Sequence, residues 1–146
     1  MGDGAIPMIT LWGLPVEATM LVLAVCLGLV QVVMSATTKT MHRGLGYALG
    51  PRDEPGAPVG IFASRIERAL ENFKETFPLF AVAVLVAAAS GRLNATTAWG
   101  AELYLLGRLL FVPLYAFGVP VARTVVWFAA LIGIIAILVG ATTIPV

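Results

Sequence analysis

The sequence predicts an all-α membrane protein built as a bundle of four transmembrane helices. Of its 146 residues, 60% are hydrophobic and only 12% are charged, a balance well outside that of soluble domains. Crossing the hydrocarbon takes about 20 apolar residues in a helix, and the chain offers four such stretches. The formal net charge of +1, without a concentrated basic face, argues against nucleic acid as a partner.

The first two expected helices differ in length and polarity. The first covers about residues 16–38, where Glu17 and Gln31 are the polar interruptions. The second covers about residues 61–90, which at 1.5 Å per residue extends roughly 45 Å and exceeds the bilayer core. Its polar first half should therefore lie among headgroups and water, while "FPLFAVAVLVAAA" crosses the lipid.

The third and fourth expected helices form a tight antiparallel hairpin. They cover about residues 98–117 and 121–142, with "GVP" between them. Residues 39–60, rich in glycine and proline, are expected to form a polar cytosolic loop between the first two helices. We expect the whole chain, residues 1–146, to form one membrane domain.

Basic residues predict the orientation, because they concentrate on the cytoplasmic side of membrane proteins. Arg123 flanks the third connection, on the same side as the first loop, whereas Arg92 lies on the opposite side. Both termini are therefore expected to face away from the cytosol. The basic residues around the first loop are Lys39, Arg43, Arg52, Arg65, Arg68 and Lys74.

The second helix carries a narrow polar stripe. At 100° per residue, an arc of about 80° holds Arg65, Arg68, Asn72 and Glu75. Glu71 and Lys74 fall elsewhere and are typical of an exposed pair. One interpretation of the stripe is a belt of arginines that contact lipid phosphates, with Glu75 neutralising one of them. Asn72 and Glu75 instead favour a bound polar ligand, because a belt needs neither an amide nor a carboxylate.

The third helix carries a matching stripe. It consists of Tyr104, Arg108, Phe111 and Tyr115. Arg108 lies deep in an apolar helix and needs a partner inside the protein. A salt bridge to Glu75 that only holds two helices together is one interpretation, and a ligand pocket between the two stripes is another; both can hold. Arg123, followed by Thr124, opens the fourth helix, where it could also be only a membrane anchor.

The pattern R-x-x-R-A-x-x-N-x-x-E-x-F-P-L-F, from Arg65 to Phe80, resembles the second helix of the MAPEG family, the membrane-associated proteins in eicosanoid and glutathione metabolism. The likeness covers most of the chain and includes "GPRDEP" in the first loop, as in bacterial members. It implies a multi-pass protein of a bacterial inner membrane, assembled as a homotrimer. It also implies a glutathione site between the second helix of one subunit and the first helix of its neighbour.

The resemblance implies roles for individual residues. Arg123 matches the arginine that faces the thiol, and the Thr124 hydroxyl is a possible further donor. Phe111 stands where several glutathione-using relatives place a tyrosine, so one hydrogen-bond donor is missing. Gln31 matches a polar position on the first helix. The other expected glutathione-binding residues are Arg65, Arg68, Asn72, Glu75, Arg108 and Tyr115.

The chemistry of glutathione agrees with this set of residues. Glutathione carries two carboxylates, an amine and a thiol, which call for arginine forks, an anion such as Glu75 and a group that favours the thiolate. A guanidinium near the thiol lowers its pKa from about 8.5 by favouring the charged form. We therefore expect a glutathione transferase or peroxidase, without a metal, whose second substrate is an apolar electrophile or lipid hydroperoxide. The alternative is a lipid-binding scaffold of the same family without catalysis.

Overall fold

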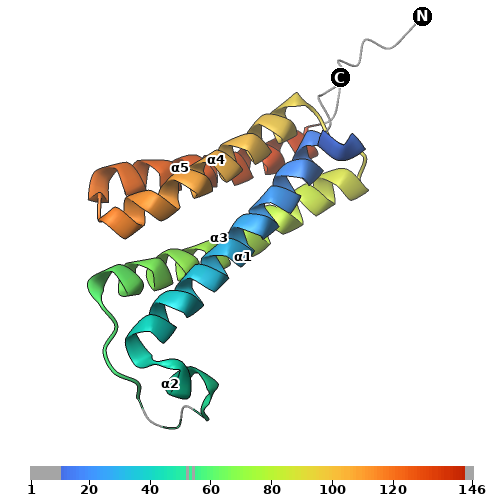
Figure 1. The fold of residues 1–146 in the computed structure, drawn as a ribbon. Helices are drawn as coiled ribbons and strands as arrows, with labels where there is room; N and C mark the ends of the chain where they lie inside the picture. Colours follow the sequence, from blue (N-terminus) through green and yellow to red (C-terminus); the bar gives the residue numbers. More distant parts are fainter. Residues whose placement is uncertain (1–10, 52, 54, 144–146) are drawn as a thin grey trace, which may run out of the picture.

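The computed structural model describes residues 11–51, 53 and 55–143, and α-helices make up most of them (Figure 1). Four of these helices are long and apolar enough to cross a membrane, within the described residues. This confirms the predicted all-α architecture with four candidate spans. The elements are the 3-10 turn η1 (Leu11–Gly13), α1 (Val16–Arg43), α2 (Leu45–Leu49), α3 (Ile61–Ala89), α4 (Ala95–Phe117) and α5 (Pro120–Thr142).

The connection between α1 and α3 is more ordered than the sequence suggested. α1 continues to Arg43, beyond the expected end near residue 38, and α2 follows directly after Gly44. Part of the loop expected over residues 39–60 is therefore helical, namely residues 39–43 and 45–49. A count of apolar residues marks where the hydrocarbon ends, but a helix can continue into the headgroups and water. Arg52 and Glu54 of this connection lie outside the described residues.

The α4–α5 hairpin is fixed by a glycine C-cap. Gly118 adopts a left-handed conformation with φ of 76°, which favours glycine because it has no Cβ. The Gly118 N–H donates to the Tyr115 carbonyl at 3.1 Å, and the Val119 N–H donates to the Leu114 carbonyl at 2.9 Å. This pair of bonds is a Schellman motif, which ends α4 and lets α5 begin at Pro120.

Small residues let α4 and α5 approach closely along their length (Figure 1). A Cβ added at Gly133 would lie 2.5 Å from the Gly100 carbonyl oxygen, and one added at Gly107 would lie 2.8 Å from the Val126 carbonyl oxygen. Such backbone contact is typical of helix pairs in membranes, where association depends on close packing. The hairpin is therefore a firm support for side chains near its turn.

A polar cluster joins α1, α4 and α5 at the end of the bundle away from the hairpin turn. Asn94 caps the N-terminus of α4, and its side-chain amide donates to the Gly140 carbonyl at 2.9 Å. Glu17 is fully buried and accepts a hydrogen bond from the Thr97 hydroxyl. The start of α1 and the end of α5 consequently lie at the same end of the bundle.

The core is narrow and the exterior is apolar, as expected for a protein that faces lipid. Phe80 of α3 stacks on Tyr104 of α4 with ring centroids 3.9 Å apart, and alanines fill the space around them. Many large apolar side chains instead point outward from all four long helices. Examples are Leu29, Val33, Leu79, Leu85, Leu106, Phe128 and Ile135.

Candidate functional site

Arg108 is the buried centre of a polar network between α3 and α4. Its side chain is 1% exposed, and its Nη1 donates to Asn72 Oδ1 at 2.7 Å while its Nη2 donates to the Thr76 hydroxyl. The Thr76 hydroxyl also lies 3.4 Å from the Tyr104 hydroxyl. Neutral acceptors thus bind the two terminal nitrogens of the guanidinium, while its buried Nε bonds to no described residue. The bond from Nη1 keeps the Asn72 amide in one orientation.

The interpretation of the sequence in which Arg108 forms a direct salt bridge with Glu75 was wrong. Glu75 is exposed, and its Oε2 accepts from Asn72 Nδ2 at 3.4 Å. Asn72 and Thr76 lie one helical turn apart on the side of α3 that faces α4, so they reach the guanidinium first. Asn72 therefore stands between the buried cation and the exposed carboxylate.

A pocket of about 210 Å³ opens where α3, α4 and α5 meet near the hairpin turn. Its cation is Arg123, whose guanidinium carbon lies 4.5 Å from the centre of the Tyr115 ring. Arg68 approaches the same ring at 6.0 Å from α3. Two guanidinium groups thus converge on one tyrosine beside the Asn72 amide. The residues that line the pocket are Asn72, Phe111, Tyr115, Arg123, Thr124 and Trp127.

Arg65 and Gln31, two of the expected site residues, are not among those that line the pocket, and Thr124 lines it with its hydroxyl already bonded. Arg65 Nη1 donates to the Ala116 carbonyl at 3.3 Å, so it holds the end of α4 against α3. Gln31 is 2% exposed, and neither atom of its amide bonds to a described residue. Thr124 lines the pocket, but its hydroxyl donates to the Pro120 carbonyl at 3.0 Å, so its proton is not directed to a ligand in the way expected.

The structure therefore brings together part of the expected set. Tyr115 and Arg123 line the pocket with Asn72, while Arg68 and Glu75 lie beside it and are exposed in the single chain. Arg108 lies beneath and contacts the pocket through Asn72. Gln31 is not among the residues that line the pocket.

Sequence reasoning missed Thr76 and Trp127. Each follows a recognised residue by four positions, Thr76 after Asn72 and Trp127 after Arg123, which places it on the same helix face. The Trp127 indole Nε1 is buried and bonds to no described residue, although it belongs to the pocket lining. A search for polar atoms at i+4 from the arginines and the asparagine could have found both.

The cations, the tyrosine and the amide can bind an anionic polar molecule and favour negative charge on it. Among the described residues, no three His, Cys, Asp or Glu side chains are grouped so that they could hold a metal ion. The fold and the pocket together define a polytopic membrane protein with a cationic site at one end of its helices.

Comparison with known protein families identifies the class more closely. The model of the MAPEG family matches residues 18–143, and the chain belongs to this family of integral membrane proteins. The family assignment made from the second-helix motif is thereby confirmed. The MAPEG family includes glutathione-dependent transferases and peroxidases. A search of the curated proteins gave no match.

Proposed function

We propose that this protein binds glutathione in the pocket between α3, α4 and α5 and uses its thiolate against apolar electrophiles or lipid hydroperoxides. The observation that supports this most strongly is the meeting of Asn72, Tyr115 and Arg123 in one pocket, although they come from three different helices. Membership of a family with glutathione-dependent members makes glutathione the ligand to test first.

The polar groups of glutathione find complementary partners around the pocket. Arg68 offers a guanidinium fork to a carboxylate, and Glu75 offers a carboxylate to the amine. Asn72 is already oriented by Arg108 at 2.7 Å, so binding costs little further ordering of this amide. The unsatisfied indole N–H of Trp127 is a further donor for an anionic ligand.

Arg123 is the group proposed to activate the thiol. It lies in the pocket, half-buried, where a positive charge acts more strongly than in open water. A nearby guanidinium lowers the pKa of a bound thiol, and the thiolate is the nucleophile. Tyr115, whose ring contacts the Arg123 guanidinium, helps to hold that charge in place.

The membrane setting accounts for the second substrate. An apolar electrophile or a lipid hydroperoxide partitions into the bilayer and can reach the pocket between the helices. We further propose that the protein lies in the inner membrane of a bacterial cell and that the pocket opens toward the cytosol. Both chain termini would then lie on the opposite side of this membrane, an orientation that the distribution of basic residues favours.

A homotrimer forms part of the same proposal. Arg68 and Glu75 are exposed in the single chain, beside the pocket and next to the apolar part of α3. A neighbouring copy would cover them and complete the walls of the site.

We expect light scattering in mild detergent, corrected for bound detergent, to give the mass of three chains. A monomer mass would contradict this part of the proposal.

The proposed function is tested by following glutathione consumption by the purified protein. With a generic aromatic halide or with a lipid hydroperoxide as second substrate, we expect conjugation or reduction above the uncatalysed rate. In protein with Asn72 changed to Leu, which alters the pocket lining and removes an acceptor of the buried Arg108, the rate should fall; the comparison is made once helical content matches the wild type. A rate equal to that without protein, for both substrates, would contradict catalysis.

One observation favours the alternative of a lipid-binding scaffold. Phe111 is buried and lines the pocket, where a tyrosine would add a hydroxyl donor. If glutathione is held without that donor, its affinity and the activation of its thiol are weaker. Saturable lipid binding without turnover would then be the observed behaviour.

A further inference from the structure

The hydroxyl of Thr76 is a buried junction between α3 and α4. Thr76 is 4% exposed, and its oxygen accepts from Arg108 Nη2 and lies 3.4 Å from the Tyr104 hydroxyl. Its own proton is directed along α3, toward the Asn72 and Phe73 carbonyls, each at 3.4 Å. Since a hydroxyl has one proton and two lone pairs, the Tyr104 hydroxyl is the donor to Thr76. Both lone pairs of the Thr76 oxygen are then occupied by donors from α4.

The same hydroxyl fixes the plane of the Arg108 guanidinium. The guanidinium carbon lies 5.6 Å from the centre of the Tyr104 ring and 5.4 Å from the centre of the Phe111 ring, so aromatic contacts hold the group laterally. A guanidinium is planar and carries its donors in a fixed fork, so the position of Nη2 on Thr76 determines where Nη1 lies. Nη1 is thereby directed at the Asn72 side chain.

The direction of the Asn72 amide follows from this contact. Arginine only donates hydrogen bonds, so Nη1 can bond to the amide oxygen of Asn72 but not to its nitrogen, and the oxygen lies at 2.7 Å. The amide nitrogen then faces the other way and donates to Glu75 Oε2 at 3.4 Å. The reversed amide would set donor against donor at Arg108 and acceptor against acceptor at Glu75. A buried hydroxyl thus determines which atom of Asn72 faces the edge of the pocket.

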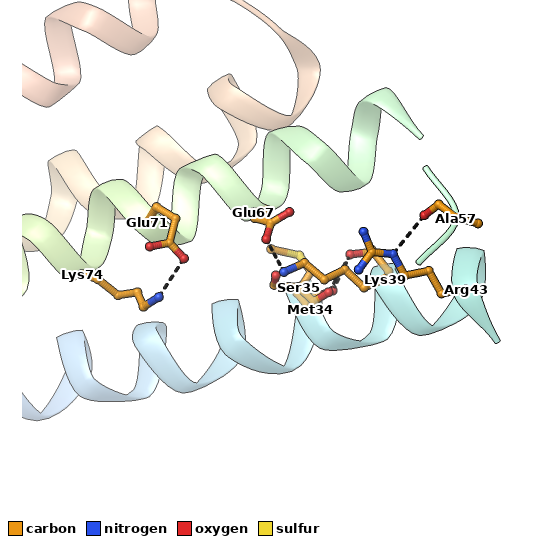
Figure 2. A network of polar contacts seen from close by, with 9 residues as sticks. Met34, Ser35, Lys39, Arg43, Ala57, Glu67, Glu71 and Lys74 are labelled. Carbon is orange, nitrogen blue, oxygen red and sulfur yellow. Dashed lines mark hydrogen bonds and ion pairs between the residues drawn. The ribbon is translucent and has the colours of Figure 1, made fainter. Parts of the chain in front are cut away.

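Glu75 is available to a ligand in this arrangement. Its Oε2 is held by the Asn72 amide, and it forms no ion pair with a described residue. The nearby pair of Lys74 with Glu71 lies on another side of α3, toward α1 (Figure 2). The edge of the pocket therefore presents an N–H donor beside a carboxylate. An amine and a carboxylate carried by one carbon, as at the glutamyl end of glutathione, complement this pair.

We propose that Thr76 is a positioning residue of this site. Through Arg108 it fixes the direction of the Asn72 amide and the place of the Glu75 carboxylate, and it thereby sets the preference of the site for a ligand that carries an amine. The inference rests on the proposed glutathione site and adds to it a residue that does not line the pocket. Without the hydroxyl, Nη2 loses its acceptor among the described residues, and the amide can adopt both directions.

Calorimetric titration of the detergent-solubilised protein with two tripeptides tests this inference. One is glutathione, and the other is glutaryl-cysteinyl-glycine, which is glutathione without its amine. We expect the wild type to bind glutathione roughly tenfold more tightly, because a charged amine gains a hydrogen bond to a carboxylate. In Thr76→Val, which removes the hydroxyl, this ratio should fall to about threefold or less. Thr76→Ser keeps a hydroxyl and should keep the ratio. The matched control is Thr142→Val, whose hydroxyl bonds to carbonyls of its own helix, and it should also keep the ratio.

The ratio of the two affinities separates positioning from a general loss of structure. A Thr76→Val protein that loses affinity for both tripeptides equally would show only a structural role and overturn the inference, and so would a wild type that binds both equally. If Thr76→Val does not fold, as judged by helical content and elution volume, Thr76→Ala removes the same hydroxyl and is measured in its place. A wild type that binds neither tripeptide would overturn the proposed function itself, and the inference with it.

Discussion

Changing Arg123 to Leu is expected to lower turnover about 100-fold or more while weakening glutathione binding much less. The reason is that the guanidinium acts mainly on the charge of the sulfur, which grows when the thiolate forms. An interaction that is stronger with the reacting form than with the resting form contributes to turnover, not to affinity. The measurement is a comparison of turnover at saturating glutathione with the dissociation constant from calorimetry.

The matched control for this prediction is Arg123→Lys. It keeps a positive charge near Tyr115 but loses the planar fork, so its turnover should fall between those of the wild type and of Arg123→Leu. If Arg123→Leu leaves both turnover and affinity unchanged, Arg123 is only a membrane anchor. The proposed site would then lack its activating group.

Changing Arg68 to Ala is expected to weaken glutathione binding by about 2 kcal/mol, or roughly 30-fold. Arg68 is exposed beside the pocket and 6.0 Å from the Tyr115 ring, where its fork can reach a ligand carboxylate. The change removes a charge-assisted pair of hydrogen bonds. Calorimetric titration of the detergent-solubilised protein with glutathione measures the loss.

Lys74→Ala is the control for Arg68→Ala, because it removes a cation from the other side of the same helix. Lys74 is paired with Glu71 at 2.7 Å and is not among the residues that line the proposed site, so glutathione affinity should change little. Similar losses in the two variants would favour general attraction by surface charge over a specific site. They would support the belt of lipid-contacting arginines that the sequence left open.

The four long helices could be predicted from the sequence because each depends on local composition. A run of about 20 apolar residues marks a span without any knowledge of its neighbours. The third helix nevertheless begins at Ala95, earlier than residue 98, because Asn94 caps it through hydrogen bonds to the Thr96 and Thr97 N–H groups. A hydropathy pattern does not detect a helix cap. It also does not detect the extension of α1 to Arg43, because a helix can continue beyond the last apolar residues of a span.

The polar stripes of the second and third helices were predictable from spacing, but the partners of each side chain were not. Their opposite charges suggested a salt bridge between Arg108 and Glu75. In the structure Arg108 instead donates to the neutral side chains of Asn72 and Thr76. Arg65 shares the stripe, yet its position beside the hairpin turn directs it to the Ala116 carbonyl. These contacts depend on how two helices cross, and periodicity within one helix does not determine that.

Gln31 shows the same limit on the first helix. The family resemblance placed it among the glutathione-binding residues, and the structure buries it to 2% exposure among residues of its own chain. A polar residue on a membrane helix can face a ligand, a neighbouring copy or its own bundle, and sequence alone does not separate these. The environment of Gln31 depends on which face of α1 packs on α3. Gly28, which lies against the Phe73 ring, belongs to the packed face, and Gln31 follows it by three residues.

The central claim, that Arg123 favours the thiolate of bound glutathione, is tested most directly by an ultraviolet titration. The thiolate absorbs near the ultraviolet edge where the thiol does not, so a difference spectrum against pH reports the pKa of the bound thiol. We expect this pKa to lie below the value of about 8.5 for a free thiol in the wild type and to rise toward it in Arg123→Leu. Identical titrations of the two proteins, both at the pKa of free glutathione, would contradict the claim.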